Sequence, residues 1–314
     1  MASTALVAPE LSLEHLTPHG HPERPERFSA VMGALASSGL DAQMERLASV
    51  ATDLETISLC HGADYIRAVE RDIAAGSPHL STGDTHLSPQ SLAVALEAVG
   101  AVIAAVDAIE AGKQNNAFCA LRPPGHHARP NQGMGFCIFN NVAIGARHAI
   151  RRHGMERVLI ADWDVHHGNG TQDIFYDDPA VLFFSTHQSP WYPGTGMIRE
   201  TGEGAGKGST INCPFPSGSG RDEILGAFRD KLLTAANEFK PDLVMISAGF
   251  DSRLGDPLGE FRLSDEDFAE LTEMILEVAD KHCEGRLVSV LEGGYSLTGL
   301  ASGVTSHVTA LVNA

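Results

Sequence analysis

The most constraining feature of this chain is a set of metal-binding side chains at alternate positions, directly after an apolar run. Residues 158–161 read Val-Leu-Ile-Ala, which is typical of a buried strand. In an extended chain alternate side chains share a face and lie roughly 6.6 Å apart, so Asp162, Asp164 and His166 can converge. Carboxylate oxygens and neutral imidazole nitrogens suit zinc or a similar divalent ion. The end of this strand is therefore a candidate metal site.

Three more apolar runs end in reactive residues. Residues 117–121 precede the tandem histidines His126 and His127, residues 243–248 lead to Asp251, and residues 287–291 lead to Tyr295 through two glycines. In open parallel sheets, ligands bind beyond the carboxyl ends of the strands. We therefore expect these segments to form one site.

Each segment also has an ordinary structural explanation. A histidine pair in a loop is often just surface polarity, and Asp251 could simply cap a turn. The glycines at 293 and 294 could form a tight connection that tolerates positive φ. All of these explanations would have to hold together at four strand ends, which favours a single functional site.

Helical and strand patterns alternate along the chain. Residues 89–111 carry apolar side chains at helical spacing, Ser264 to Asp267 resembles a capping box, and Asp222 could cap a helix that runs to Phe239. This alternation predicts an α/β fold in which a mainly parallel sheet lies between two helix layers. We predict a single catalytic domain over residues 1–314, because no linker, repeat or low-complexity tract interrupts it.

The motifs together resemble those of the histone deacetylase superfamily. That superfamily also contains bacterial acetylpolyamine amidohydrolases, and the resemblance is to its class II-like bacterial histone deacetylase-like amidohydrolases. It extends over nearly the whole chain in the family's order and implies the arginase/deacetylase fold. The matching segments are residues 21–27, 122–128, 133–137, 162–172, 247–251, 256–259 and 292–295.

The resemblance implies a metal centre. Asp164, His166 and Asp251 match the three metal ligands, which leaves open positions for a water and a substrate carbonyl. Two carboxylates and one neutral imidazole balance the charge of a divalent ion. We expect zinc, with iron(II) as the alternative in the cell, because these ligands accept either.

The resemblance also implies the proton-transfer groups. His126 and His127 match the histidines that take a proton from the attacking water and protonate the leaving amine. Asp162 matches the partner of His126, and Asn169 lies behind His127. Because a carboxylate raises the basicity of its histidine and an amide does not, the two histidines should titrate differently. Tyr295 matches the hydrogen-bond donor to the developing oxyanion.

Further positions match less distinctive parts of the family pattern. The substrate tunnel is expected to involve Gly135, Phe136 and Tyr192, and the internal acetate pocket Arg27 and Cys137. Structural potassium ions are expected near two groups of residues: Asp162, Asp164, His166, Ser185 and Thr186 for the first, and Phe175, Asp178 and Val181 for the second.

The function implied is a metal-dependent amidohydrolase that acts on N-acyl amides, first of all acetyl-lysine. The alternative is an acetylpolyamine or another small N-acyl amine, and the rim loops at 81–89 and 188–196, or a homo-oligomer that narrows the entrance, would decide between them. A binuclear ureohydrolase would need more carboxylates where this chain has two histidines and a tyrosine. A catalytically idle protein that binds acyl-lysine would not need the intact site.

Charge and hydropathy limit the partners. The formal net charge of −18 disfavours nucleic acid and tolerates cationic substrates. Residues 1–9 show no secretory leader, and the apolar helix at 89–111 carries Glu97, Asp107 and Glu110, so we expect no membrane span. The five cysteines form no Cys-x-x-Cys pair and are typical of buried thiols. These features favour a cytoplasmic protein.

Overall fold

One eight-stranded sheet runs through residues 4–314, the part of the chain that the computed structural model describes. The strand order is β2-β1-β3-β8-β7-β4-β5-β6, and every neighbouring pair is parallel. Residues 1–3, part of the segment in which we expect no leader, lie outside the described residues. The strands are β1 Thr4–Val7, β2 Glu45–Leu47, β3 Asn116–Cys119, β4 Val158–Asp162, β5 Val181–Gln188, β6 Thr210–Phe215, β7 Leu243–Ala248 and β8 Leu287–Leu291.

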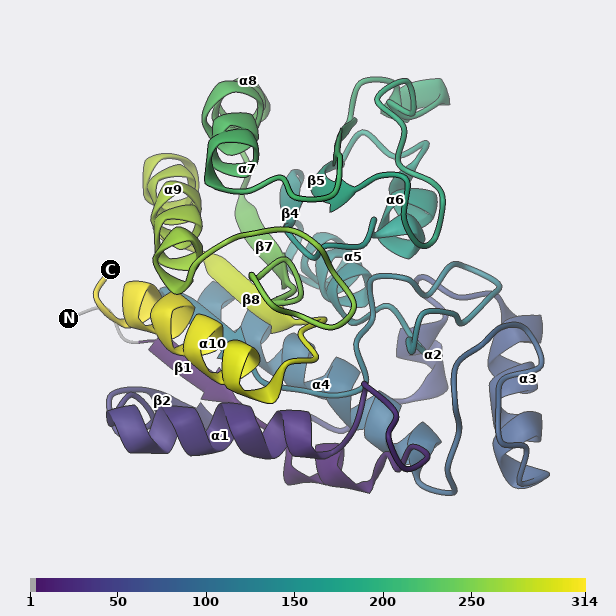
Figure 1. Cartoon of the computed structure of the whole chain (residues 1–314). Helices are drawn as coiled ribbons and strands as arrows, with labels where there is room; N and C mark the ends of the chain where they lie inside the picture. Colours follow the sequence, from purple (N-terminus) through teal and green to yellow (C-terminus); the bar gives the residue numbers. More distant parts are fainter. Residues whose placement is uncertain (1–3) are drawn as a thin grey trace.

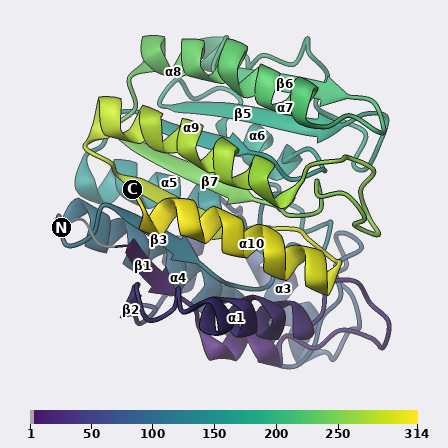
Figure 2. The same cartoon turned by 60° about the vertical axis from the view of Figure 1, so that its left-hand side comes forward.

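Helices cover both faces of this sheet. Figure 2 shows α8, α9, α10 and α1 stacked across one face, with α4, α5 and α6 behind the sheet (Figure 1). The helices are α1 Glu26–Ser38, α2 Leu54–Ile57, α3 Ala63–Ala74, α4 Ser91–Glu110, α5 Asn141–His153, α6 Asn169–Phe175, α7 Arg221–Ala227, α8 Leu233–Phe239, α9 Asp265–Cys283 and α10 Leu297–Val312. Short 3-10 turns cover Glu10–Glu14 and Gly204–Gly206, and a π-helical turn, Phe228–Leu232, joins α7 to α8.

The strands are apolar on both faces because both faces are covered. In β4, Leu159 and Ala161 belong to the core beneath α9 and α10, whereas Val158 and Ile160 belong to the core beneath α4 and α5. This alternation follows from the two-residue period of a strand. The predicted three-layer α/β/α architecture with a parallel sheet is confirmed.

The four strands singled out in the sequence are neighbours. They form the centre of the sheet in the order β3-β8-β7-β4, and all run in the same direction. Their carboxyl ends therefore meet at one edge. This adjacency, which the sequence could not give, brings the reactive segments together.

Some local expectations need correction. Gly220, not Asp222, is the residue before α7, and the helix is interrupted by the π-helical turn before it reaches Phe239. Helix α4 is long and apolar enough to cross a membrane by length and composition, contrary to our expectation, but 72% of that stretch is buried inside the protein.

The capping box before α9 is confirmed: Asp267 N–H donates to Ser264 Oγ, and Ser264 N–H donates to Asp267 Oδ2. All five cysteines are free and buried.

A buried ion pair fastens the segment before α1 to the end of β3. Glu23 and Arg122 are both completely buried, with Arg122 Nε 2.5 Å and Nη2 2.7 Å from the two carboxylate oxygens of Glu23. Arg27 contacts the same carboxylate at 3.2 Å. Burial alone would raise the pKa of Glu23, but the charge and hydrogen bonds of Arg122 lower it to about 2.

We expect Glu23→Gln to destabilise the protein by about 3 kcal/mol at neutral pH, because breaking a buried pair leaves a buried arginine charge uncompensated. The folded pKa is depressed, so the contribution of Glu23 is complete above its unfolded pKa of 4.5 and is lost as the pH falls through about 2. Urea unfolding of the unmodified protein and the variant across this pH range should show that their difference in free energy of unfolding becomes smaller as the pH falls. The exposed neighbour Glu26→Gln is the control, and a pH-independent difference would contradict the assignment to this ion pair.

Candidate metal and catalytic site

Asp164, His166 and Asp251 lie together beyond the ends of β4 and β7. His166 Nδ1 is 3.0 Å from Asp164 Oδ1 and 3.2 Å from Asp251 Oδ2. All three side chains are buried, and one ligand atom from each lies within 4.8 Å of the others. Two carboxylate oxygens and an imidazole nitrogen at this spacing fit a divalent ion of the zinc class.

The charges in this group also favour a cation. Burial, together with the negative charge of Asp164, raises the pKa of Asp251 to about 7. Burial opposes the charged form of Asp164 as well, but His126 and His166 hold its pKa well below the usual range. Within residues 4–314 neither carboxylate has an arginine or lysine partner. Among the described residues the buried negative charge of this group is therefore balanced only by histidines, whose place a divalent cation can take.

Gly293 leaves the space into which these carboxylates fit. Its N–H donates to Asp164 Oδ2 at 2.9 Å. A Cβ at this position would lie 2.0 Å from Asp251 Oδ2 and 2.5 Å from Asp164 Oδ2, closer than any non-bonded contact allows. The glycine after β8 is therefore required by close approach to the ligand group.

The tandem histidines lie side by side, with ring centroids 4.1 Å apart, but have different partners. His126 Nδ1 is 2.9 Å from Asp162 Oδ2, whereas His127 Nδ1 is 2.7 Å from Asn169 Oδ1. Burial alone would lower the pKa of His126, but Asp162 and other nearby carboxylates raise it well above the usual value. Burial and the neighbouring His126 lower the pKa of His127 well below it. The pKa values of the two histidines are thus shifted in opposite directions, in line with the expectation that they titrate differently.

Glu292 is a site residue that sequence reasoning did not assign. It follows β8 directly, is completely buried, and its Oε2 accepts hydrogen bonds from the N–H groups of Gly125 at 2.7 Å and His126 at 3.1 Å. Burial raises its pKa to about 7. Glu292 fixes the backbone that carries the histidine pair. The only sequence signal for this role is its position directly before Gly293.

Tyr295 is held from three sides. The ring of Phe136 meets it edge-on at 5.8 Å, and the guanidinium of Arg27 lies 4.9 Å from its ring centroid. Asp256 Oδ2, which sequence analysis did not assign, accepts the N–H groups of Tyr295 at 2.7 Å and Ser296 at 3.0 Å. Within residues 4–314 the Tyr295 hydroxyl makes no hydrogen bond, so it remains available to a ligand.

A cavity of about 300 Å³ opens above this group. His127, His166 and Tyr295 line it, so one histidine of the pair, one candidate ligand and the tyrosine share the same space. The other lining residues are Asp84, Gly135, Phe136, Trp191, Tyr192, Pro257 and Leu258. All three residues predicted for the tunnel are among them. Asp84 and Trp191 belong to the predicted rim loops 81–89 and 188–196, whereas Pro257 and Leu258, in the matching segment 256–259, were not assigned to the tunnel.

The residues predicted for the acetate pocket lie behind the cavity wall. Arg27 is buried and donates to the carbonyl oxygens of Glu292 at 2.5 Å and Gly294 at 2.7 Å. Cys137 is also completely buried, and its thiol donates to the carbonyl of Gly135 at 3.3 Å. Neither residue lines the cavity, and their predicted role stays a prediction.

The residues predicted to hold potassium form two separate groups. In the first, Ser185 lies opposite Asp162 in the β4–β5 register, and Thr186 follows it. In the second, Asp178 forms an ion pair with Arg147, whose guanidinium also lies 4.7 Å from the Phe175 ring centroid. These are structural facts about the residues, and the ions themselves stay a prediction.

Known proteins are similar to this chain in sequence and fold. The profile of the histone deacetylase domain matches residues 21–311. This chain belongs to the histone deacetylase family. A probable deacetylase of Archaeoglobus fulgidus is 41% identical over 298 residues, which cover 94% of this chain and 82% of the relative.

Two further matches add to this result. The human protein named polyamine deacetylase HDAC10 is 39% identical over 301 residues, which cover 92% of this chain and 44% of that protein. The crystal structure of the HDA15 HD domain superposes with a TM-score of 0.94 at 35% identity and covers 99% of this chain and 88% of that one. The chain is thus a deacetylase-type amidohydrolase, an enzyme that hydrolyses amide bonds.

We expect Gly293→Ala to remove one tightly bound zinc per chain, because the added methyl group overlaps both candidate carboxylate ligands. Gly33→Ala in α1, where a Cβ meets nothing within 4 Å, is the matched control and should keep full metal content. Zinc counted by mass spectrometry after dialysis, with circular dichroism to verify folding, measures the difference. Equal zinc content in the two variants would contradict the ligand assignment.

Proposed function

We propose that this histone deacetylase family member is a zinc-dependent lysine deacylase, with acetyl-lysine in proteins or peptides as its first substrate. The observation that carries the proposal is that His127, His166 and Tyr295 line one cavity above the buried carboxylates. A proton acceptor, a metal-binding group and a free hydroxyl donor thus share a single space. Amide hydrolysis needs these three groups together.

Asp164, His166 and Asp251 would hold the metal. A zinc ion there would supply Lewis-acid chemistry, polarising the substrate carbonyl and lowering the pKa of a water. Iron(II) suits the same ligands and is the alternative in the cell. The buried carboxylates of Asp164 and Asp251, which have only histidine partners among the described residues, support this assignment.

His127 is the proposed proton-transfer group. It is unprotonated at neutral pH because burial and His126 lower its pKa, and its Nδ1–H donated to Asn169 leaves Nε2 as the acceptor. His127 can therefore take a proton from the attacking water and return it to the leaving amine. His126, kept protonated by Asp162, adds positive charge beside it.

Tyr295 is the proposed oxyanion donor. Its hydroxyl has no hydrogen-bond partner among the described residues, and Asp256, Phe136 and Arg27 fix the backbone and the ring. A fixed donor needs little reorganisation during the reaction and stabilises negative charge that develops on the carbonyl oxygen.

The cavity walls favour a long, mostly apolar side chain. Phe136, Tyr192 and Leu258 form an apolar lining that can contact the methylene groups of an acylated lysine. Asp84 is the single carboxylate among the lining residues, and it already accepts hydrogen bonds from Gly135 N–H and the Tyr192 hydroxyl. A polyamine carries further ammonium groups that would need additional carboxylates at the rim.

An acetylpolyamine or another small N-acyl amine is the second candidate. The similarity to a protein named polyamine deacetylase and the net charge of −18 favour it. Asp84 at the cavity could receive one ammonium group.

Several accompanying features belong to the same proposal. Thr186 Oγ1 is buried and has no hydrogen-bond partner within residues 4–314, which supports a potassium ion beside Asp162 and Ser185. We also propose that residues 1–314 act as one catalytic domain, with a cytoplasmic location and no nucleic-acid or membrane partner. A homo-oligomer that narrows the cavity entrance would favour the small-molecule alternative.

We expect Tyr295→Phe to keep its zinc and its fold while kcat falls by about a hundredfold or more, since an oxyanion donor is lost. KM should change little, because the hydroxyl acts mainly in the transition state. Steady-state kinetics with a fluorogenic acetyl-lysine peptide measure this. Tyr176→Phe changes a half-buried tyrosine that does not line the cavity, and it serves as the control. Turnover equal to that of the unmodified protein would remove the oxyanion role.

The substrate class is tested with a matched panel. The zinc-loaded protein is given acetyl-lysine and trifluoroacetyl-lysine peptides beside acetylputrescine and acetylspermidine, each with and without a hydroxamate inhibitor. We expect peptide turnover that the hydroxamate blocks. Turnover confined to the polyamines would support the second candidate instead, and no turnover on any substrate would contradict both.

A further inference from the structure

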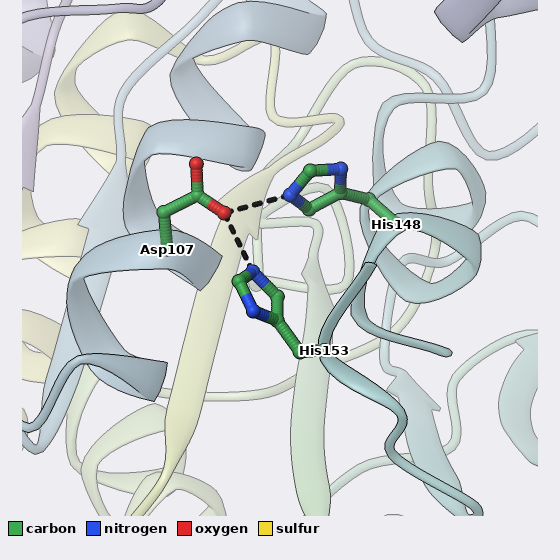
Figure 3. Close-up of side chains that lie close together, drawn as sticks. All are labelled: Asp107, His148 and His153. Carbon is green, nitrogen blue, oxygen red and sulfur yellow. Dashed lines mark hydrogen bonds and ion pairs between the residues drawn. The ribbon is translucent and has the colours of Figure 1, made fainter. Parts of the chain in front are cut away.

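A second group of metal-binding side chains lies at the contact between α4 and α5, away from the strand ends. Asp107 Oδ1 is 2.7 Å from Nε2 of His148 and 2.7 Å from Nε2 of His153 (Figure 3). One ligand atom from each of the three residues lies within 4.8 Å of the others. This group shares no residue with the proposed catalytic site.

The outer nitrogen of His153 also has a carboxylate partner. Its Nδ1 is 3.4 Å from Glu110 Oε2, and Glu110 lies one helical turn after Asp107 on α4. Metal-binding histidines usually donate their second N–H to a carboxylate, which fixes the ring and directs the other nitrogen to the metal. Glu110 is in the position to do this for His153.

A neutral His153 cannot donate a hydrogen bond to both of its carboxylate neighbours, which favours a cation here. A neutral imidazole has one N–H and one lone pair. If neutral His153 donates to Asp107, its Nδ1 lone pair faces the carboxylate of Glu110, and if it donates to Glu110, its Nε2 lone pair faces Asp107. Either tautomer sets a lone pair against a carboxylate oxygen. A second proton on His153, or a metal ion between the rings and Asp107, would relieve this contact.

The ligand set and its exposure favour a metal ion. The side chains of His148 and His153 are 16% and 15% exposed, so the nitrogens are largely shielded, whereas Asp107 is 42% exposed and gives access from solvent. The two rings meet edge to face, with an interplanar angle of 78°, so their Nε2 atoms can point at one ion without the rings colliding. Two imidazole nitrogens and one carboxylate oxygen suit zinc, with water completing the shell.

We propose that Asp107, His148 and His153 form a second zinc-class metal site, oriented by Glu110, that joins the C-terminal half of α5 to α4. Both helices pack on the same face of the sheet, and α5 follows the loop that carries the histidine pair and Phe136. The metal would stabilise the contact between the helices rather than take part in amide hydrolysis.

The test counts zinc in the full-length protein after equilibrium dialysis against buffered zinc. The unmodified chain should hold two zinc ions, and the double variant His148→Ala, His153→Ala should hold one. Asp251→Ala, which removes a ligand of the other site, should also hold one, and the combination of both changes should hold none. As the control, His282→Ala changes a half-buried histidine whose partner is Asn237, and this variant should keep two zinc ions.

Milder variants cover the case in which the double variant misfolds. Asp107→Asn preserves the shape of the side chain and should also lose one zinc. Glu110→Gln should lower the affinity for that zinc by about tenfold. Zinc should raise the Tm of Asp251→Ala but not that of the combined variant.

The results separate this proposal from the proposed function. An Asp251→Ala protein that binds no zinc, or a folded His148→Ala, His153→Ala variant that still binds two, would overturn the second site and leave a protonated ion pair in its place. Deacylase activity should survive in the double histidine variant. Absence of turnover by the unmodified zinc-loaded protein on all substrates would speak against the proposed function and not against this metal site.

Discussion

The burial of several carboxylates at one edge of the sheet is the constraint on which the site depends. Asp162, Asp164, Asp251 and Glu292 are all completely buried, and an isolated buried charge costs several kcal/mol unless it is paired. Asp162 is paired with a histidine, and Glu292 accepts two backbone N–H groups. Among the residues that the structure describes, Asp164 and Asp251 have only histidines as cationic partners: His166 contacts both, and His126 lies 3.8 Å from Asp164. This dependence on histidine partners is the physical argument for the proposed divalent ion.

The same constraint explains the glycines and the order of the strands. Carboxylates can meet only where strand ends are adjacent, and the order β3-β8-β7-β4 provides that adjacency. The chain that follows β8 must then pass very close to the carboxylates, which Gly293 permits because it has no Cβ. Charge, topology and local residue choice therefore agree at this one edge.

The second metal-binding group was hidden from sequence reasoning for a physical reason. Asp107 was read only as a charge on an apolar helix, and His148 and His153 belong to no motif. They come together because α4 and α5 pack against each other, a contact between residues 41 and 46 positions apart. Helix packing, unlike a strand end, leaves no pattern of reactive residues after an apolar run.

By itself the sequence determined the α/β class, the strands with their reactive ends and the family. Periodicity and short motifs are local properties, so they predicted the strand before Asp162 and the different partners of His126 and His127. Only the tertiary structure decided which strands are neighbours, that Glu292 and Asp256 hold the backbone of the site, and that Arg27 and Cys137 lie behind the cavity instead of lining it. Those facts depend on contacts between distant segments, which packing and the pairing of buried charge select and which no local pattern records.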